Sequence, residues 1–169
     1  MHTLYLLRHA KSSWADPTLP DHERPLASRG RRDAKRIADY LVRLGIEPEL
    51  VLCSPARRTR ETLELLRPAL GATPTIRLEE ELYAASSDRL LERIRALPEA
   101  VSSVMLIGHN PGLQQLAVVL SSSGAELERL DAKFPTAALA TLALANTSWS
   151  QLCHTDAVLA AYVVPKQLG

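Results

Sequence analysis

A short apolar run near the N-terminus, residues 4–7, constrains the fold of this chain more than any other feature. A run this short and rich in leucine is typical of a strand that is buried on both faces. It stops at Arg8 and His9, two residues that do not belong in a core. The pair is therefore expected at the C-terminal end of a strand, where open α/β sheets bind their ligands. An Arg-His pair at such an end is more often a solvated loop entry, so this stretch alone does not establish a site.

Further short apolar runs alternate with segments of helical periodicity. Strands are predicted at residues 49–53, 75–78, 103–107, 137–145 and 157–164, the last as a possible edge strand. Helices are predicted from about residue 30 to Gly45, from Pro55 to about Arg67 with Ser54 as the cap, and at 88–97 and 113–120. Residues 15–25 are predicted as a loop, and residues 121–134 are polar and loosely patterned. The alternation favours an α/β fold, with a mainly parallel sheet between two layers of helices, in a single domain over residues 1–169.

Composition excludes several classes of function. The chain has 20 Lys and Arg against 19 Asp and Glu, so no whole-molecule field gathers nucleic acid or a membrane surface. Cys53 and Cys153 lack metal-ligand spacing and lie in apolar stretches, which predicts reduced core residues of an intracellular protein. No run approaches the ~18 apolar residues of a membrane-spanning helix, and no signal peptide is evident. We therefore expect a cytoplasmic protein.

Three predicted strands end in residues with unusual chemistry. Arg8 and His9 follow the first strand, the arginine-rich turn 54–62 follows the second, and His109 follows the strand at 103–107. Because parallel strands share one C-terminal edge, these groups can converge on one crevice from distant parts of the chain. Guanidinium groups bind phosphoryl oxygens and a neutral imidazole can attack phosphorus, so the combination indicates a phosphoryl site.

The motifs at these strand ends resemble those of a known family. They occur in the order LLRHAKSSW, ERPLASRG, SPARRTRET and IGHNPGL, beginning at residues 6, 23, 54 and 107. The first is similar to the Arg-His-Gly signature of the histidine phosphatase superfamily, which has the phosphoglycerate mutase-like fold, with Ala10 in the glycine position. Four such motifs on so short a chain resemble the SixA-type phosphohistidine phosphatases.

The resemblance implies a role for each motif. His9 would be the nucleophile that becomes phosphorylated, and Arg8 would bind the phosphoryl group beside it. The phosphate-binding arginine of the third motif falls on Arg58 rather than Arg57, and consecutive helical residues point about 100° apart, so only one of the two is expected to face the site. His109 would be a phosphate ligand that stabilises the charge of the transition state.

Other positions are assigned less directly. Ser12 matches a polar position that can reach the phosphoryl group, and it is equally well explained as a loop serine. Arg24 belongs to the second motif and is expected to touch substrate, on the rim formed by residues 14–25. Relatives that act on phosphate esters use a carboxylate after the third strand as general acid, which here implies Glu81 among the glutamates 79–81.

The implied reaction is hydrolysis of phosphohistidine on a protein, through a phosphorylated enzyme histidine and without metal or another cofactor. The partner would be a phosphohistidine-bearing protein, for example a histidine phosphotransfer domain. A protonated nitrogen leaves easily, so a phosphohistidine phosphatase tolerates a poorly placed general acid. The chain also has no room for a large insertion between its second strand and residue 103, so the crevice is expected to be open enough for a phosphohistidine on a protein surface. The alternatives are a small-molecule phosphomonoesterase of the same superfamily and a non-catalytic phosphate-binding protein. A mutase is less favoured, because it needs a closed site.

Overall fold

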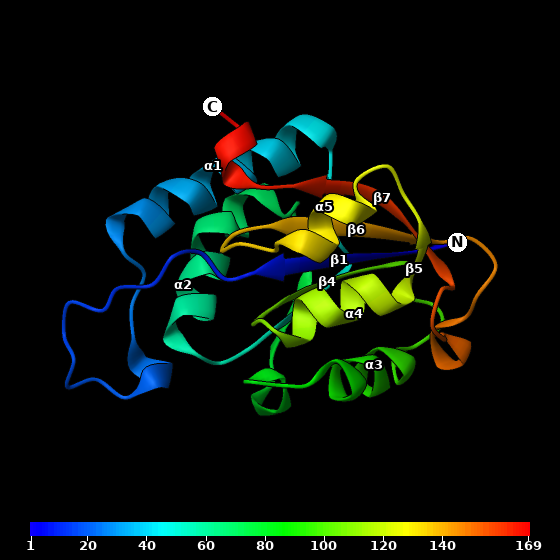
Figure 1. Ribbon diagram of the computed structural model, residues 1–169, viewed down its shortest axis with the longest axis horizontal. Coiled ribbons are helices and arrows are strands. Elements are labelled where there is room, and N and C mark those ends of the chain that lie inside the picture. Colours follow the sequence, from blue (N-terminus) through cyan, green and yellow to red (C-terminus); the bar gives the residue numbers. More distant parts are fainter.

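The computed structural model describes residues 1–169 and contains one continuous seven-stranded sheet. The order of the strands in the sheet is β3-β2-β4-β1-β6-β7-β5 (Figure 1). β1, β2, β3 and β4 run parallel to one another, and β6 runs antiparallel to both β1 and β7. The strands are β1 (His2–Arg8), β2 (Leu50–Cys53), β3 (Thr75–Leu78), β4 (Ser103–Gly108), β5 (Ser121–Ser123), β6 (Leu139–Leu144) and β7 (Ala157–Val163).

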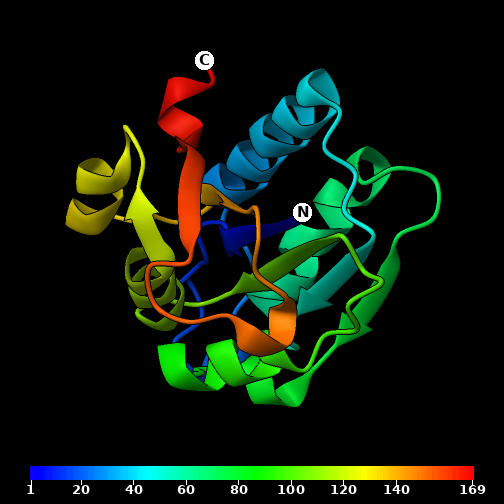
Figure 2. The same ribbon diagram turned by 90° about the vertical axis from the view of Figure 1, so that its right-hand side faces the viewer.

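Helices cover both faces of the sheet, which confirms the predicted three-layer α/β architecture (Figure 2). α1 (Ser28–Leu44) and α2 (Arg57–Leu66) pack on one face. α3 (Ser87–Arg95), α4 (Gly112–Leu120) and α5 (Leu127–Ala132) pack on the other. None of these helices combines the length and the apolar character needed to span a bilayer.

Burial of β1 on both faces explains why its central residues are apolar without alternation. Leu4 and Leu6 face the α3 and α4 layer, whereas Leu7 faces the α1 and α2 layer, and all three are fully buried. Successive side chains of a strand point to opposite faces, so a strand covered on both sides must be apolar at every position. Each of these leucines contributes about 2 kcal/mol by leaving water. β1 is therefore a rigid base for the residues that follow it.

The last third of the chain holds elements that the sequence does not predict, and one prediction there is wrong. Residues 121–134, which are polar and loosely patterned, contain β5 and the short helix α5. β5 consists of serines, which lack strand propensity, so its pairing with β7 gives no local signal. β7 consequently lies between β6 and β5 and is not an edge strand.

The start of α2 and one cysteine also differ from expectation. α2 begins at Arg57, and Ser54 does not cap it, because the Ser54 hydroxyl instead contacts His109 at 2.7 Å. Cys53 is buried as predicted, but Cys153 is exposed, since it lies in the turn before β7 rather than in the core.

The beginning of α1 packs directly against the loop that follows β1. A Cβ built on Gly30 would lie 2.1 Å from the carbonyl oxygen of Lys11, so only glycine fits here. The Ala27 N–H donates to the same Lys11 carbonyl at 2.9 Å. The close approach holds residues 10–12 in place beside the end of β1.

We expect Gly30→Ala to lower the free energy of unfolding by about 1–3 kcal/mol, because its methyl group must displace backbone rather than a flexible side chain. This loss outweighs the roughly 0.5–1 kcal/mol that alanine gains over glycine within a helix. Urea unfolding measures the difference. Lys35→Ala, on the exposed side of the same helix, is the matched control and should stay within about 0.5 kcal/mol of wild type. A Gly30→Ala protein as stable as wild type would contradict this interpretation.

Candidate active site

The C-terminal ends of β2, β4 and β1 are neighbours in the sheet, as the sequence predicts for a convergent site. Arg8 pairs with Gly108 across the parallel ladder, so His9 and His109 leave adjacent strands at the same level. Their ring centroids lie 5.3 Å apart. Arg58 reaches the same place from the first turn of α2, which follows β2.

His9 is fixed in one tautomer. Its Nδ1 lies 2.7 Å from the carbonyl oxygen of Ala10, and because a carbonyl only accepts, Nδ1 carries the hydrogen. Its backbone N–H donates to the Gly108 carbonyl at 3.1 Å. Nε2 of a neutral ring therefore keeps its lone pair.

The surroundings keep this ring neutral. Burial lowers the pKa of His9 to about 3, and the charges of His109, Arg58 and Arg8 act in the same direction. The bond to Ala10 opposes the shift without cancelling it. At neutral pH His9 is accordingly an unprotonated base with a free Nε2.

Two guanidinium groups, the half-buried Arg8 and the buried Arg58, lie close to His9. Arg8 donates from Nη1 to the Phe134 carbonyl at 3.1 Å, and Arg58 donates from Nη1 to the Asp21 carbonyl at 2.8 Å. The Nε–H groups of both arginines have no acceptor. Burial and the charge of Arg58 lower the pKa of Arg8. Two cations crowded together with unused donors are suited to an anion between them.

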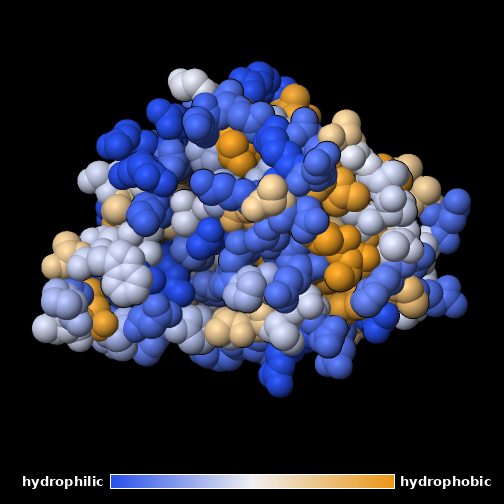
Figure 3. All heavy atoms as spheres, in the orientation of Figure 1, coloured by the Kyte–Doolittle hydropathy of each residue, from blue (hydrophilic) through white to orange (hydrophobic).

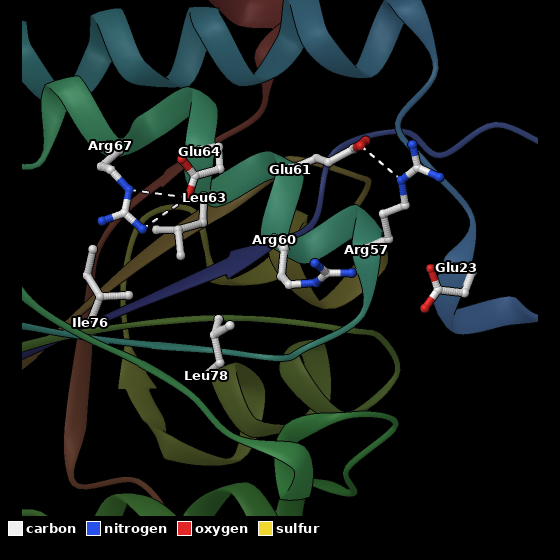
Figure 4. A pocket seen from close by; sticks show the side chains of 9 residues that line it. All are labelled: Glu23, Arg57, Arg60, Glu61, Leu63, Glu64, Arg67, Ile76 and Leu78. Atoms are coloured by element: carbon white, nitrogen blue, oxygen red, sulfur yellow. Dashed lines mark hydrogen bonds and ion pairs between the residues drawn. The ribbon is translucent and has the colours of Figure 1, made fainter.

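The prediction that Arg58, and not Arg57, faces this cluster agrees with their positions. The Arg58 side chain is 7% exposed, whereas that of Arg57 is 40% exposed and bonds to Glu61 at 3.1 Å. Arg57 lines a separate cavity of about 450 Å³ between α2 and β3 (Figure 4). There Arg57 is paired with Glu61 and Arg67 with Glu64, while Arg60 donates to the Pro55 carbonyl at 2.8 Å. No histidine lines this cavity, so it offers no nucleophile of the kind that His9 provides.

His109 is held by two polar groups. A guanidinium group can only donate, so Nδ1 accepts from Arg58, over a long 3.4 Å, and Nε2–H donates to the Ser54 hydroxyl at 2.7 Å. Burial first, and then the charge of Arg58, lowers the pKa of His109 to about 4. The sequence predicts Ser54 as a helix cap, and the spacing of Ser54 and His109 gives no sign of their contact.

Asp21 organises the rim, a role that its sequence context does not predict. Its carboxylate accepts from Tyr83 at 2.5 Å, Arg58 at 3.0 Å and Arg24 at 3.2 Å. The Tyr83 hydrogen bond, followed by those of the arginines, lowers the pKa of Asp21 to about 2 although burial opposes this. The Tyr83 ring in turn packs edge-on against His109. The only signal in the sequence is the position of Asp21, three residues before Arg24 in the second motif.

Ser12 and Arg24 lie at the site and contact each other. Arg24 Nη1 donates to the Ser12 hydroxyl at 2.7 Å, and its guanidinium stacks 3.6 Å from the ring centre of Trp14. Trp14 is largely exposed while Ser12 and Arg24 are buried. These residues form the rim that the sequence predicts. An isolated antiparallel bridge between Ser12 and Leu26 ties the two ends of this loop together.

Glu81 is not brought to the site. Its side chain is 54% exposed and lies 3.5 Å from Arg93. Glu79, the neighbouring alternative, bonds to the same arginine at 2.6 Å. Both carboxylates thus belong to an ion-pair cluster with α3, and neither faces the histidines.

The converging side chains line a small depression of about 240 Å³. No carboxylate is among its lining residues, which are Arg8, His9, Lys11, Ser12, Trp14, Arg24, Arg58, His109, Asn110 and Thr136. A neutral imidazole beside two guanidinium groups can attack the phosphorus of a bound phosphoryl group. The fold and the depression together are those of an α/β protein that binds and transfers phosphoryl groups.

Comparison with known proteins gives the family. The profile of the histidine phosphatase superfamily (branch 1) matches residues 4–88, and this chain belongs to that superfamily. It is similar to the phosphohistidine phosphatase SixA of Escherichia coli, with 30% identity over 64% of this chain and 67% of the relative.

Solved structures agree with this assignment. The protein assigned as SixA in Agrobacterium tumefaciens is 34% identical and has a TM-score of 0.79, over 97% of this chain and 99% of that one. A protein histidine phosphatase SixA complexed with tungstate is 25% identical, with a TM-score of 0.80 over 99% of both chains. The phosphoglycerate mutase-like fold and the SixA-like character expected from the sequence are thereby confirmed.

We expect neither His9 nor His109 to titrate between pH 8 and pH 5, because burial and the neighbouring arginines lower the pKa values to about 3 and about 4. Ring ¹³C shifts measured by NMR against pH test this, with the two signals assigned from His9→Asn and His109→Gln. The unfolded chain in urea is the control, since its imidazoles should titrate near a pKa of about 6.5.

The same shifts make stability depend on pH. Where a folded-state pKa lies below the unfolded one, the unfolded chain binds more protons, so the contribution of these histidines to stability is fully present above about pH 6.5 and falls as the pH drops. A midpoint near pH 6.5 for either folded histidine would contradict the assignment.

Proposed function

We propose that this protein hydrolyses phosphohistidine on a partner protein through a covalent intermediate on Nε2 of His9. One observation carries the proposal: Nδ1–H of His9 donates to the Ala10 carbonyl, which leaves Nε2 unprotonated within the cluster of Arg8, Arg58 and His109. Membership of the histidine phosphatase superfamily and similarity to SixA support the same reaction.

In the first step the lone pair of His9 Nε2 attacks phosphorus, and the phosphorus–nitrogen bond of the substrate breaks. A substrate imidazole that carries a proton on its other nitrogen takes the bonding electrons and leaves neutral. Arg8 and Arg58 bind the oxygens of the transferring group, and their Nε–H groups have no competing acceptor in the protein. His109, whose ring centre lies 5.3 Å from that of His9, adds a further contact when its Nε2–H donates to a phosphoryl oxygen in place of the Ser54 hydroxyl.

In the second step water attacks the phosphorus of phospho-His9. Nδ1 of His9 keeps its hydrogen bond to Ala10 throughout, so the phosphorylated ring carries a positive charge. When the phosphorus–nitrogen bond breaks, the ring takes the electron pair and returns as the same neutral tautomer. The water proton passes to the phosphate product or to solvent, and no group has to protonate Nε2.

The chemistry of the leaving group favours a phosphoramidate over an ester. An alkoxide leaves poorly and needs a proton donor, whereas a protonated imidazole does not. No carboxylate lines the depression, and Asp21, whose pKa is about 2, is ionised at neutral pH and cannot donate. The depression, at about 240 Å³, is also smaller than the roughly 300–1,000 Å³ of most small-molecule pockets, which suits a phosphohistidine side chain whose carrier protein stays outside.

We expect wild-type protein to turn over a phosphohistidine-bearing domain faster than an aryl phosphomonoester, and His9→Ala to remove both activities. Glu81→Gln should change turnover of the phosphohistidine domain by less than about twofold, because this carboxylate lies with Arg93 outside the site. Stopped-flow assays with both substrates measure these rates.

A faster reaction with the ester that Glu81→Gln removes would make the protein a small-molecule phosphatase. Activity that survives in His9→Ala would overturn the mechanism itself. Binding of phosphate without turnover of either substrate would identify a phosphate-binding protein.

We also expect Asp21→Asn to lower kcat/KM by about tenfold, because Arg58 loses a bond between charged groups worth roughly 1.5–3 kcal/mol. The Tyr83 hydrogen bond to Asp21 raises the pKa of Tyr83, so the same variant should lower that pKa. Ultraviolet absorbance titration reports it, with Tyr83→Phe identifying the signal. Unchanged kcat/KM together with a lowered tyrosine pKa would show that Asp21 does not position Arg58.

A further inference from the structure

A wide basic groove lies beside the histidine depression. It has a volume of about 610 Å³ and runs between the start of α1, the loop before β6 and the end of β7. Figure 3 shows mainly hydrophilic surface over this part of the molecule, around a small hydrophobic spot. The lining residues are Arg29, Arg32, Asp33, Arg36, Arg129, Lys133, Pro135, Thr136, Tyr162, Val164, Pro165 and Lys166.

The charge of this groove is concentrated. Six cations and one carboxylate line it, although the whole chain carries a net charge of only +1. The carboxylate, Asp33, is buried and already paired with Arg36 at 3.1 Å and Arg29 at 3.7 Å. Arg32, Lys133 and Lys166 have no carboxylate within 4.0 Å. The groove therefore presents positive charge that the protein itself does not neutralise.

The groove and the histidine depression share a wall. Thr136 lines both cavities. Two residues earlier, the Phe134 carbonyl accepts from Arg8, and one residue later, Ala137 N–H donates to the carbonyl oxygens of Arg8 and His9. The hydroxyl of Tyr162, in the groove, donates to the Lys133 carbonyl at the start of the same loop. A molecule seated in the groove would lie next to a phosphoryl group on His9.

We propose that the groove docks an acidic surface of the protein substrate, next to its phosphohistidine. This inference rests on the proposed function and adds the chemistry of the partner to it. The occupant carries aspartate and glutamate side chains around its phosphorylated histidine, and these face the cations of the groove. Attraction of this kind raises the rate of encounter and orients the partner more than it tightens the final complex.

The character of the groove favours a protein over a small anion. Even the cations that are paired within the protein remain partly exposed, with fractions of 63% for Arg29, 41% for Arg36 and 42% for Arg129, so the groove offers a broad rim of accessible charge. A small anion would meet Asp33 among the lining groups. The floor contains Tyr162, Pro135 and Pro165, which supply an apolar surface for contact with another chain.

The test compares two charge-reversal variants of equal net charge. The groove variant is Arg32→Glu, Lys133→Glu and Lys166→Glu. The control variant is Lys35→Glu, Arg77→Glu and Arg89→Glu, at exposed positions that line neither cavity. Both are assayed with a phosphorylated histidine phosphotransfer domain whose surface around the phosphohistidine is acidic, and with free phosphohistidine, over a range of salt concentrations.

We expect the groove variant to lose about tenfold or more in kcat/KM on the acidic domain, mainly through KM, and to keep its activity on free phosphohistidine. The salt dependence of kcat/KM should weaken in this variant. The control variant should stay within about threefold of wild type on both substrates.

Equal losses in the two variants, or an equal loss on free phosphohistidine, would overturn the docking proposal while leaving the phosphatase activity intact. Wild-type protein inactive on both substrates would instead overturn the proposed function, and the docking proposal with it. Fluorescence anisotropy with a single-stranded DNA oligonucleotide tests the alternative that the groove binds nucleic acid. Micromolar binding that only the groove variant loses would assign the groove to nucleic acid and overturn the proposal.

Discussion

A single hydrogen bond, from Nδ1 of His9 to the carbonyl oxygen of the next residue, sets the chemistry of this site. It needs no additional side chain, because the acceptor is backbone. The bond requires the turn after β1 to hold one conformation, and three contacts provide this: the Ala10 N–H donates to Thr62, the Ala27 N–H donates to Lys11, and Gly30 packs on Lys11 without a side chain. The glycine in a helix far from the chemistry is thus part of the support for the nucleophile.

The electrostatics follow from the same arrangement. Burial of the His9 imidazole lowers its pKa, and the charges of the neighbouring arginines act in the same direction, so the nucleophile stays neutral without a carboxylate to orient it. The carboxylate that the site does contain, Asp21, acts on the arginines instead. It arrives on the loop between β1 and α1, to the left in Figure 1, and links Arg58, Arg24 and Tyr83 at the rim. The arginines that attract phosphate thus lie at the end of β1 and in α2, whereas the carboxylate that positions Arg58 lies in the loop between β1 and α1.

The sequence predicts those parts of the molecule that have a local pattern. Residues 4–7 of β1 and 104–107 of β4 are apolar because both faces of these strands are covered, and polar residues follow each run, so the amino-acid order predicts Arg8, His9 and His109 at one sheet edge. Helical geometry and the resemblance together distinguish Arg58 from Arg57. Contacts that depend on three-dimensional approach have no such pattern: Asp21 with Tyr83, Ser54 with His109, and β5 with β7. Glu81 is the expected acid because carboxylates cluster after β3, yet a nearby arginine on α3 holds that cluster away from the histidines.

The loop before β6 has a consequence for how this protein can diverge. Toward the histidines it offers main-chain groups, the Phe134 carbonyl and the Ala137 N–H, and toward the groove it offers Lys133 and Pro135. Main-chain groups persist whatever residue carries them, provided that the backbone keeps its course. Substitutions in this loop can accordingly alter the outer surface while the support of Arg8 is retained. One segment therefore supports the reactive residues through its main-chain atoms and shapes the groove through its side chains. Selection can change the side chains while the main-chain support is inherited unaltered.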